Sequence, residues 1–556
     1  MRRHRLLLFL AAVFAAKLVV VLQLRHHPLL QADVPGFEST SYATLASAGR
    51  FGVPPLYVYF LALLLKVVKG FAAVRIVQIV LGTIAVGCVF AAARIWFGPR
   101  AAWIAALFAS LTGLFTFYEA TILPSALDPF LTSLALATLA AGLAPRGTRQ
   151  TLWFGVSLVA FALFLLNRPA LIYGGLRFYA GNNAAADGTY RPVAGIGAED
   201  LVQQRLDARN VAEASSGRTL DDDGVSSYFY SLGRSWIRLH PGDAASNLRR
   251  KIALVFNAAH VSPSYSYPFF ADDADTLLKF LFVGPWLLLP LGVVGLGSGA
   301  LLIRRREYAM WAAFVPLFAF AVTVFFVTER ARLPVLIPLC VGAGAVADYV
   351  MSRRSYGILL ALAAIAGLAM LANRPLPHDD GRAEDRTRMA EAMIVRDRVD
   401  LAEQWAARAI QIHPRPSDVH LRVGRRLVVH SRPDAAIAHL ERVLRDDPSS
   451  ADANFAMGQA LVGAKRPREA IPRLRAAMQG GMRESLVGYE LARAMAASGD
   501  RAGALQALQA VRPEDPADVD TWNALGQLAL QLGSPSLAAS FFNGESRARQ
   551  LRQGIK

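Results

Sequence analysis

The sequence changes character near Pro375, and this change limits what the chain can fold into more than any other feature. Before it lie nine long apolar runs, and after it come five polar units that repeat every 34 residues. A chain of 556 residues that is 54% hydrophobic, with a mean hydropathy of +0.34, holds more apolar surface than one globular core buries. We therefore expect lipid to solvate the first part, and we predict two all-α domains, at 1–375 and 376–556.

The charge and the cysteines exclude two classes of function. The net charge is +17, but many arginines cluster beside apolar runs, where they act as orientation anchors rather than as a nucleic-acid surface. Cys88 and Cys340 both lie inside apolar runs, a setting that suits neither a disulfide framework nor a paired-cysteine metal site. Nucleic acid is therefore not an expected partner, and redox chemistry is not expected.

The apolar runs predict a polytopic membrane bundle. The first run continues past Lys17 to Leu24 without a convincing cleavage site, so we interpret it as an uncleaved span rather than a signal peptide. The nine expected spans lie at 1–24, 71–93, 101–118, 124–143, 151–166, 277–303, 309–327, 333–351 and 356–373.

The loops between these spans predict sidedness. With the N-terminus in the cytoplasm, the loops at 94–100, 145–150, 304–307 and 352–355 are cytoplasmic, and all of them are basic. The run 55–68 would reverse this topology if it crossed the membrane. Because it is short and carries Lys66, we assign it to a helix in the outer interface. Residues 25–70, 168–276 and the whole repeat region then lie outside.

The second part of the chain has the signature of a helical repeat. Small residues recur at two positions of the 34-residue period, and Trp522 to Ala529 resembles the first helix of a tetratricopeptide repeat. The first position holds Ala390, Gly424, Gly458, Ala492 and Gly526, and the second holds Ala402, Ala436, Ala470, Ala504 and Ala538. We predict an α-solenoid of about five units that binds a protein or peptide. A passive spacer or a dimerisation surface is the structural alternative.

A series of motifs runs in order through the first 350 residues, and together they resemble a known family. The motifs are Glu38 with Tyr42 four residues later, Pro54 to Tyr57, Arg75, Phe117 to Glu119, Asn167 to Pro169, Gly181 to Asn183, and Glu329 to Pro334. In this order they resemble the GT-C superfamily of polyprenyl-phosphate-sugar-dependent glycosyltransferases, specifically the family 39 type related to protein O-mannosyltransferases. The chain departs from the family pattern at three places: Glu38 replaces aspartate, two spans are missing before Gly181, and His260 replaces an acid.

The chemistry implied by this resemblance needs cations and a base. Polyprenyl phosphate leaves as an anion, which arginine grips with a bidentate fork. Four arginines fall at predicted outer ends of spans, against the trend that places basic residues inside, and we predict that they bind the donor phosphate: Arg75, Arg168, Arg330 and Arg332. For each of them alone, snorkelling to the interface is the structural alternative.

The acceptor must lose a proton as it attacks, so a carboxylate is required near the sugar. Glu38 is the first candidate and Asp33 the second, and a solvated loop acid is the alternative for both. Glu119, at the outer end of a span, is predicted to orient the acceptor or an arginine.

The remaining candidates rest on the resemblance or on weaker patterns. The resemblance implies that Tyr42, Tyr57, Asn182 and Asn183 lie on the acceptor side, although the two asparagines also suit tandem tight turns. No metal site is assigned. A divalent cation held by His26 or His27 with Glu38 or Glu119 is left open as a cofactor.

We therefore predict a hexosyl- or pentosyltransferase of the bacterial inner membrane, with about nine spans plus an interfacial helix, followed by a periplasmic tetratricopeptide arm. The partners are a polyprenyl-phosphate-linked sugar, the lipid bilayer, and a protein or peptide bound by the arm. Two alternatives stay open. One is an enzyme like an O-antigen ligase or polymerase, and the other is a non-catalytic membrane scaffold.

Overall fold

The computed structural model describes residues 2–31, 38–47, 55–68, 70–144, 149–168, 174–196, 201–262, 265–303, 305–352, 356–376, 380–482, 484–511 and 519–554. Most of the described residues are helical and none of them forms a strand; an isolated bridge joins Thr112 to Phe282. The chain divides into two units, Met1–Arg382 and Ala383–Lys556. The expected fold class, an all-α membrane bundle followed by a tetratricopeptide α-solenoid, is confirmed.

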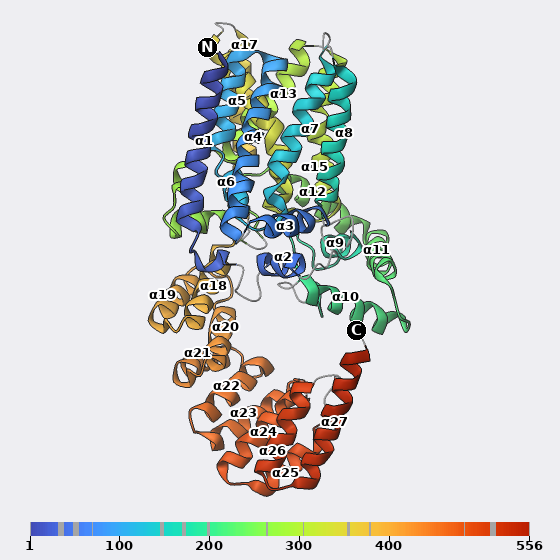
Figure 1. The fold of residues 1–556 in the computed structure, drawn as a ribbon, viewed down its shortest axis with the longest axis vertical. Coiled ribbons are helices and arrows are strands. Elements are labelled where there is room, and N and C mark those ends of the chain that lie inside the picture. Colours follow the sequence, from blue (N-terminus) through green and yellow to red (C-terminus); the bar gives the residue numbers. More distant parts are fainter. Residues whose placement is uncertain are drawn as a thin grey trace. The chain divides into compact units, whose positions relative to one another are not determined.

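The first unit is a bundle of apolar helices (Figure 1). Among the described residues, six helical stretches are long and apolar enough to cross a membrane: His4–Leu24, Phe71–Phe97, Pro124–Leu143, Pro285–Ile303, Arg306–Val324 and Glu329–Ser352. Shorter apolar helices lie at Leu56–Val67, Pro99–Leu111, Gln150–Leu166 and Gly357–Ala372. The helices of the bundle are α1 (Arg2–Leu24), α4 (Phe71–Phe97), α5 (Pro99–Leu111), α6 (Gly113–Ala120), α7 (Asp128–Leu143), α8 (Gln150–Leu166), α13 (Pro285–Ile303), α14 (Arg306–Ala312), α15 (Phe314–Val324), α16 (Glu329–Ser352) and α17 (Tyr356–Ala372).

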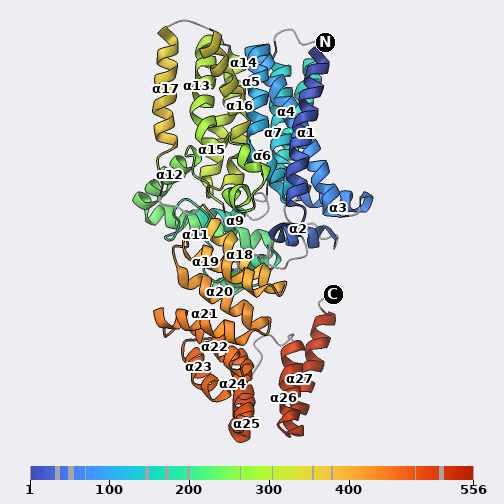
Figure 2. The ribbon, with the colours of Figure 1, turned by 90° about the vertical axis from the view of Figure 1, so that its left-hand side faces the viewer.

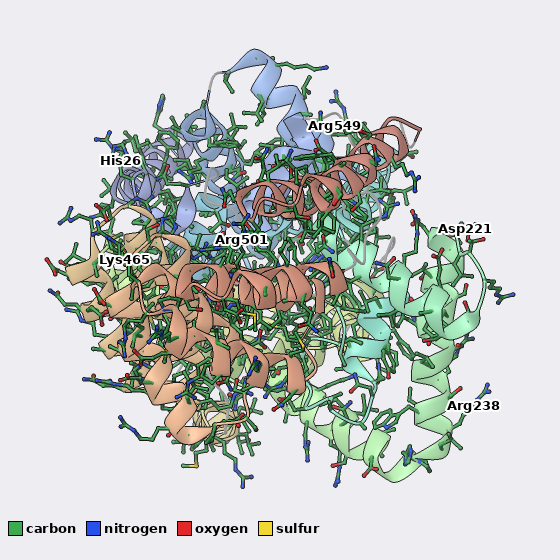
Figure 3. All side chains as sticks on the ribbon, turned by 90° about the horizontal axis from the view of Figure 1, so that it is seen from below. His26, Asp221, Arg238, Lys465, Arg501 and Arg549 are labelled. Carbon is green, nitrogen blue, oxygen red and sulfur yellow. The ribbon has the colours of Figure 1, made fainter. Side chains whose placement is uncertain are left out.

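Smaller elements gather at one end of this bundle, which we call the loop end (Figures 1 and 2). They are η1 (Pro28–Leu30), α2 (Glu38–Ser47), α3 (Pro55–Val67), η2 (Pro124–Ala126), α9 (Gly174–Gly181), α10 (Leu201–Ser216), α11 (Asp222–Leu239), α12 (Pro241–Val255), η4 (Phe269–Asp273) and η5 (Leu277–Phe280). Asp221 and Arg238 mark the two ends of α11 in Figure 3. The expected outer loops thus meet at one end.

Two expected helix boundaries are wrong. The span expected at 101–118 is broken at Thr112, whose ψ of 96° leaves the helical region while its backbone bridges to Phe282. The next residue is Gly113, and a larger residue would not fit there because a Cβ would lie 1.9 Å from the hydroxyl of Tyr267. The span expected from residue 277 begins only at Pro285, since η5 precedes it.

α3 lies where the interfacial helix was expected. Its side chains sort by exposure: Tyr57, Val58 and Leu61 are buried, whereas Tyr59, Leu63 and Val67 are 52%, 65% and 77% exposed. An apolar face left uncovered on a short helix suits a position in the lipid interface.

The second unit consists of five successive helix pairs among its described residues. They are α18 (Arg382–Val395) with α19 (Val399–Ile410), α20 (Pro416–Val429) with α21 (Pro433–Asp446), α22 (Ala451–Gly463) with α23 (Pro467–Gln479), α24 (Glu484–Ser498) with α25 (Arg501–Ala510), and α26 (Val519–Gln531) with α27 (Pro535–Gly554). The small residues of both repeat positions are buried, and a Cβ on Gly458 would lie 2.5 Å from the side chain of Leu474. Small residues therefore let paired helices approach closely.

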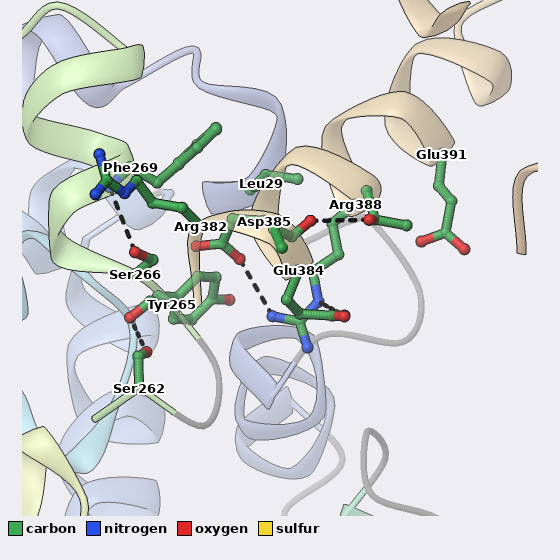
Figure 4. Close-up of polar contacts among 12 residues, drawn as sticks. Leu29, Ser262, Tyr265, Ser266, Phe269, Arg382, Glu384, Asp385, Arg388 and Glu391 are labelled. Atoms are coloured by element: carbon green, nitrogen blue, oxygen red, sulfur yellow. Dashed lines mark hydrogen bonds and ion pairs between the residues drawn. The ribbon is translucent and has the colours of Figure 1, made fainter. Parts of the chain in front are cut away.

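Ion pairs join the first two pairs of this unit. Arg422 on α20 lies 2.7 Å from Glu384 Oε1 and 2.6 Å from Glu391 Oε2. Arg388 Nε lies 3.1 Å from Glu384 Oε1 (Figure 4). Burial alone would raise the pKa of Glu384, but Arg388 and Arg422 hold it at about 2. The carboxylate is therefore charged at every physiological pH.

Candidate functional site

The first loop supplies the two predicted bases. Glu38 opens α2, which packs on α3, but its side chain lies outside the described part of the structure. Asp33 also lies outside the described residues. Tyr42 of α2 and Tyr57 of α3 are both buried, with ring centroids 5.8 Å apart and planes at 87°. Edge-to-face packing of these rings fixes α2 on α3.

A chain of hydrogen bonds connects this loop to α4 and α6. The Tyr57 hydroxyl donates to Gln78 Oε1 at 2.9 Å, and Gln78 Nε2 donates to the carbonyl oxygens of Glu119 and Thr121 at 2.7 and 2.8 Å. Arg75, one turn before Gln78, donates from Nη2 to the Leu30 carbonyl oxygen at 2.5 Å. Its Nε is buried and makes no hydrogen bond within the described residues.

Glu119 is buried and forms an ion pair with Lys17 of α1, with 2.5 Å between Nζ and Oε2. Its other oxygen, Oε1, has no hydrogen-bond partner among the described residues. The carboxyl group rests on Gly82 of α4, where a Cβ would lie 2.0 Å from Cδ of Glu119. Glu119 therefore occupies a site built from α1, α4 and α6.

A second set of charges lies on the other elements of the loop end. Asp128 opens α7 and pairs with Arg168, whose Nη2 lies 3.1 Å from Oδ2. Asn167 Nδ2 donates to Asp128 Oδ1 at 3.1 Å. The guanidinium of Arg168 stacks over Phe164 and Phe318, 4.9 and 5.5 Å from their centroids. Its Nε and Nη2 are both buried. Nε has no hydrogen-bond partner among the described residues, and Nη2 contacts Asp128 as an ion pair that falls outside hydrogen-bond geometry.

α16 completes this set with its first two residues. Glu329 is 1% exposed and accepts a hydrogen bond from the Tyr118 hydroxyl at 3.4 Å, while its Oε1 contacts Nδ1 of His260. Arg330 interacts electrostatically with Tyr118, Asp128 and Arg168. We call Asp128, Arg168, Glu329 and Arg330 the arginine–carboxylate cluster. It brings together two of the four predicted phosphate-binding arginines.

The other predicted residues serve the loop scaffold. Arg332 is buried and donates to the carbonyl oxygens of Leu254, Asn257 and Ala259 at 2.6 to 2.9 Å. Asn183 closes a turn, since its Oδ1 accepts from the Ala185 N–H at 2.7 Å.

Asn182 donates to the carbonyl oxygens of Phe178 and Val324, and its Oδ1 accepts from Lys251 Nζ at 3.0 Å. Burial lowers the pKa of Lys251 to about 8. Asn182 and Asn183 thus act as turn and anchoring residues in this structure.

Of the residues left open for a divalent cation, Glu38 has its side chain outside the described part of the structure. His26 is exposed, and His27 accepts from the Leu29 N–H through Nδ1 at 3.4 Å. Within the residues that the structure describes, no group of three or more His, Cys, Asp or Glu side chains is arranged to hold a metal ion.

Sequence reasoning missed several members of this site. Asp128 stands inside an apolar run, where an ionisable residue is by default a functional-site candidate. Its position in the sequence could therefore have identified it. Lys17 gave the same signal within α1. Glu329 lies in the motif from Glu329 to Pro334, but the sequence alone assigns no role to it.

The similarity to a known enzyme family lies within the first 200 residues. Residues 52–183 match the family model of dolichyl-phosphate-mannose-protein mannosyltransferases. This family is of the GT-C type, so the N-terminal region is similar to membrane glycosyltransferases, as the motif order indicated. The match contains Arg75, Glu119, Asp128 and Arg168. It supports a membrane glycosyltransferase of the GT-C type.

The repeat arm is matched separately. Residues 430–487 and 461–529 match the family model of the tetratricopeptide repeat, which supports a protein-binding arm. Similar solved structures include MamA 41-end from Desulfovibrio magneticus RS-1 (17% identity, 31% of this chain and 96% of that chain, TM-score 0.26) and YrrB, a tetratricopeptide protein with an unusual peptide-binding site (18%, 30% and 87%, TM-score 0.24). A putative kinesin light chain from Podosopora anserina is also similar (17%, 32% and 99%, TM-score 0.27). No curated protein matches the chain.

Proposed function

We propose that the protein transfers a hexosyl or pentosyl group from a polyprenyl phosphate to an acceptor on the periplasmic face of a bacterial inner membrane. The observation that carries this proposal is the guanidinium of Arg168 at the loop end, whose buried Nε–H has no acceptor among the described residues while Nη2 is held by the ion pair with Asp128. Buried donors without partners are costly, and a phosphate oxygen satisfies them. The match over residues 52–183 supports the same donor class.

The arginine–carboxylate cluster suits a departing polyprenyl phosphate. Arg168 and Arg330 supply positive charge, while Asp128 orients Arg168. Because the leaving phosphate needs charge stabilisation and not protonation, two positioned guanidinium groups meet its main requirement. Arg75 keeps a buried Nε–H for the same purpose, whereas Arg332 is committed to three carbonyl oxygens and is the weakest of the four predicted ligands.

Glu38 stays the sequence-based candidate for the base, with Asp33 behind it. Glu119 is better suited to positioning than to proton transfer, since Lys17 neutralises it inside the bundle. Tyr42 and Tyr57 hold α2 and α3, the helices that carry this loop. The repeat arm binds a partner protein or the acceptor itself.

The sidedness of the proposal rests on the loop end. The junction of α4 with α5, flanked by Arg94 and Arg100, and the start of α8 lie at the opposite end of the bundle from α2, α3 and α9 to α12 (Figure 1). Basic loops face the cytoplasm, so the loop end faces the periplasm. The chain leaves the first unit at this same end, because the Ala258 N–H donates to the carbonyl oxygen of Ala372, the last residue of α17, at 2.7 Å.

The test measures release of polyprenyl phosphate from a short-chain polyprenyl-phosphate mannose by the full chain in lipid nanodiscs. Arg168→Gln should lower kcat/KM by about 100-fold or more, as loss of a preorganised charge contact does. Arg168→Lys should not restore it, because lysine lacks the planar fork. Arg191→Gln is the matched control, since Arg191 is exposed and pairs only with Asp187 in the described structure. Unchanged turnover in Arg168→Gln would rule out the proposed donor site.

A further inference from the structure

The corner where α11 meets α12 exposes large apolar side chains outside the bundle. Leu239, the last residue of α11, is 75% exposed, and Leu248 and Ile252 of α12 are 41% and 46% exposed. Single exposed apolar residues are common on any protein surface. Three of them on one corner of two consecutive amphipathic helices instead indicate a surface that contacts something apolar.

α12 lies at the level where a membrane-spanning stretch ends. A buried core cluster joins Leu254 and Val255 of α12 to Ala319 and Val322 of α15. Ala319 lies more than one helical turn before Val324, at which α15 and the stretch Arg306–Val324 both end. Figure 2 shows α12 below the ends of α15 and α17. The helix therefore runs along the loop-end edge of the apolar bundle, where the boundary of the bilayer lies.

The side chains of α12 form three strips around its axis. Asn247 and Lys251 are buried and hydrogen-bond to the segment that ends α9, so this strip faces the protein. Leu248 and Ile252 lie about 100° further round the helix, and Arg249 lies about another 100° beyond Leu248. An apolar strip followed by a basic one is the arrangement of helices that lie in a membrane interface.

Four arginines surround this corner. Arg234 and Arg238 are exposed on α11, and Arg249 and Arg250 are exposed on α12. Asp243 is the one acid between them in the sequence, and no carboxylate among the described residues pairs with any of the four. Arg238 points outward from α11 in Figure 3. An excess of unpaired positive charge beside an apolar strip complements the phosphates of lipid headgroups.

We propose that the α11–α12 corner docks on the bilayer that surrounds the bundle and binds anionic phospholipids there. Leu239, Leu248 and Ile252 insert at the boundary of the acyl chains, while the four guanidinium groups reach the headgroup phosphates. Arginine suits this task because its planar fork bonds two phosphate oxygens. The inference goes beyond the proposed function and does not depend on it, since it concerns the phospholipids of the bilayer and not the donor.

The docked helix also supports the loop end. Lys251 Nζ donates to Asn182 Oδ1 at 3.0 Å from the protein-facing strip of α12. Arg332, near the start of α16, donates from Nη1 to the carbonyl oxygen of Leu254 at 2.9 Å. Anionic lipid held on one side of α12 thereby stabilises the position of the turn after α9 and of the start of α16.

The experiment uses the full chain in nanodiscs, after removal of Cys88 and Cys340, and follows the quenching of a bimane label by lipids with brominated acyl chains. A label at Ile252→Cys should be quenched strongly, because this side chain lies among the acyl chains. A label at Ala253→Cys, the next residue round the same helix, should be quenched at most about half as much. Both positions are exposed, so neither change disturbs the core. Equal quenching at the two positions, or none at either, would overturn the docking.

The charge requirement is tested with the label at residue 252 in nanodiscs of equal parts phosphatidylglycerol and phosphatidylcholine, of which only one is brominated at a time. An arginine near an anionic surface raises affinity about fivefold, so phosphatidylglycerol should be preferred about tenfold or more. The triple change Arg238→Gln, Arg249→Gln and Arg250→Gln should bring this preference close to one. No preference in the unchanged chain, or the same preference in the triple variant, would disprove the anionic site.

Two controls identify the source of the effect. Arg191→Gln with Arg218→Gln changes exposed arginines elsewhere in the outer segment and should keep the preference for phosphatidylglycerol. An excess of a short-chain polyprenyl phosphate should leave the quenching by brominated phosphatidylglycerol unchanged. Displacement by that compound would assign the corner to the donor phosphate and overturn the proposal, whereas loss of sugar transfer with intact quenching would refute the proposed function alone.

Discussion

Lys17 and Glu119, which are 102 residues apart in the sequence, form a buried ion pair that joins α1 to α6. Replacing Lys17 with Met should destabilise the chain by about 3–5 kcal/mol, because it leaves a carboxylate buried without its counter-charge. The double change Lys17→Met with Glu119→Gln should recover most of this loss. Thermal unfolding of detergent-purified protein measures both, and equal melting temperatures in the two variants would contradict the pairing.

Gly82 offers a matched test of the same site. A Cβ at this position would lie 2.0 to 2.2 Å from the carboxyl atoms of Glu119, whereas at Gly87 on the same helix the nearest atom would be Leu10 Cδ1 at 3.6 Å. Gly82→Ala should therefore cost about 1–3 kcal/mol through overpacking. Gly87→Ala should be neutral or slightly stabilising in the same melting assay. Similar melting temperatures for both would show that Glu119 does not rest on Gly82.

The repeat arm should weaken in acid. Burial, together with His439 and Arg442, lowers the pKa of His420 to about 4 against an ordinary 6.5, although Glu403 and Asp446 act in the opposite direction. The unfolded arm then binds more protons than the folded arm between these values, so stability is complete above pH 6.5 and falls as the pH drops toward 4. At pH 5 the loss should reach about 2 kcal/mol. The pKa of Glu384 is about 2 against an ordinary 4.5, so this carboxylate adds little to the loss at pH 5 and adds to it as the pH falls below 4.5.

Hydrogen exchange of the full chain checks this directly. Protection of α20 and α21, corrected for intrinsic exchange rates, should be lower at pH 5 than at pH 7.5. His420→Gln removes the titrating group and should remove most of the difference. A difference of the same size in His420→Gln would assign the effect to another residue.

Sidedness can be measured with single cysteines in a chain that has lost Cys88 and Cys340. Ser235→Cys on α11 should react with an impermeant maleimide in intact spheroplasts, because α11 lies at the loop end (Figure 2). Gln150→Cys, at the start of α8, should react only after permeabilisation. The reverse pattern would place the loop end in the cytoplasm and remove the basis for a periplasmic acceptor.

The sequence predicted what local pattern controls. The period of 34 residues placed Ala402, Ala436 and Ala470 in the core, and each of them is buried. The arginines at the predicted outer ends of spans indicated a site at the loop end, because the distribution of Lys and Arg among the loops predicts membrane topology. Contacts between segments that are far apart in the sequence produce no such local pattern. Nothing local indicates that Arg332 turns toward three carbonyl oxygens while Arg168 keeps a buried Nε–H without an acceptor among the described residues, or that His260 meets Glu329.

The bond from the Ala258 N–H to Ala372 has a mechanical consequence. Together with the bond from Asn257 Nδ2 to the Arg374 carbonyl oxygen at 2.9 Å, it joins the end of α17 to the backbone segment just ahead of His260. The end of α17 and the segment that carries His260 are thereby linked, so a change in α17 that shifts Ala372 should also alter the contact between His260 and Glu329.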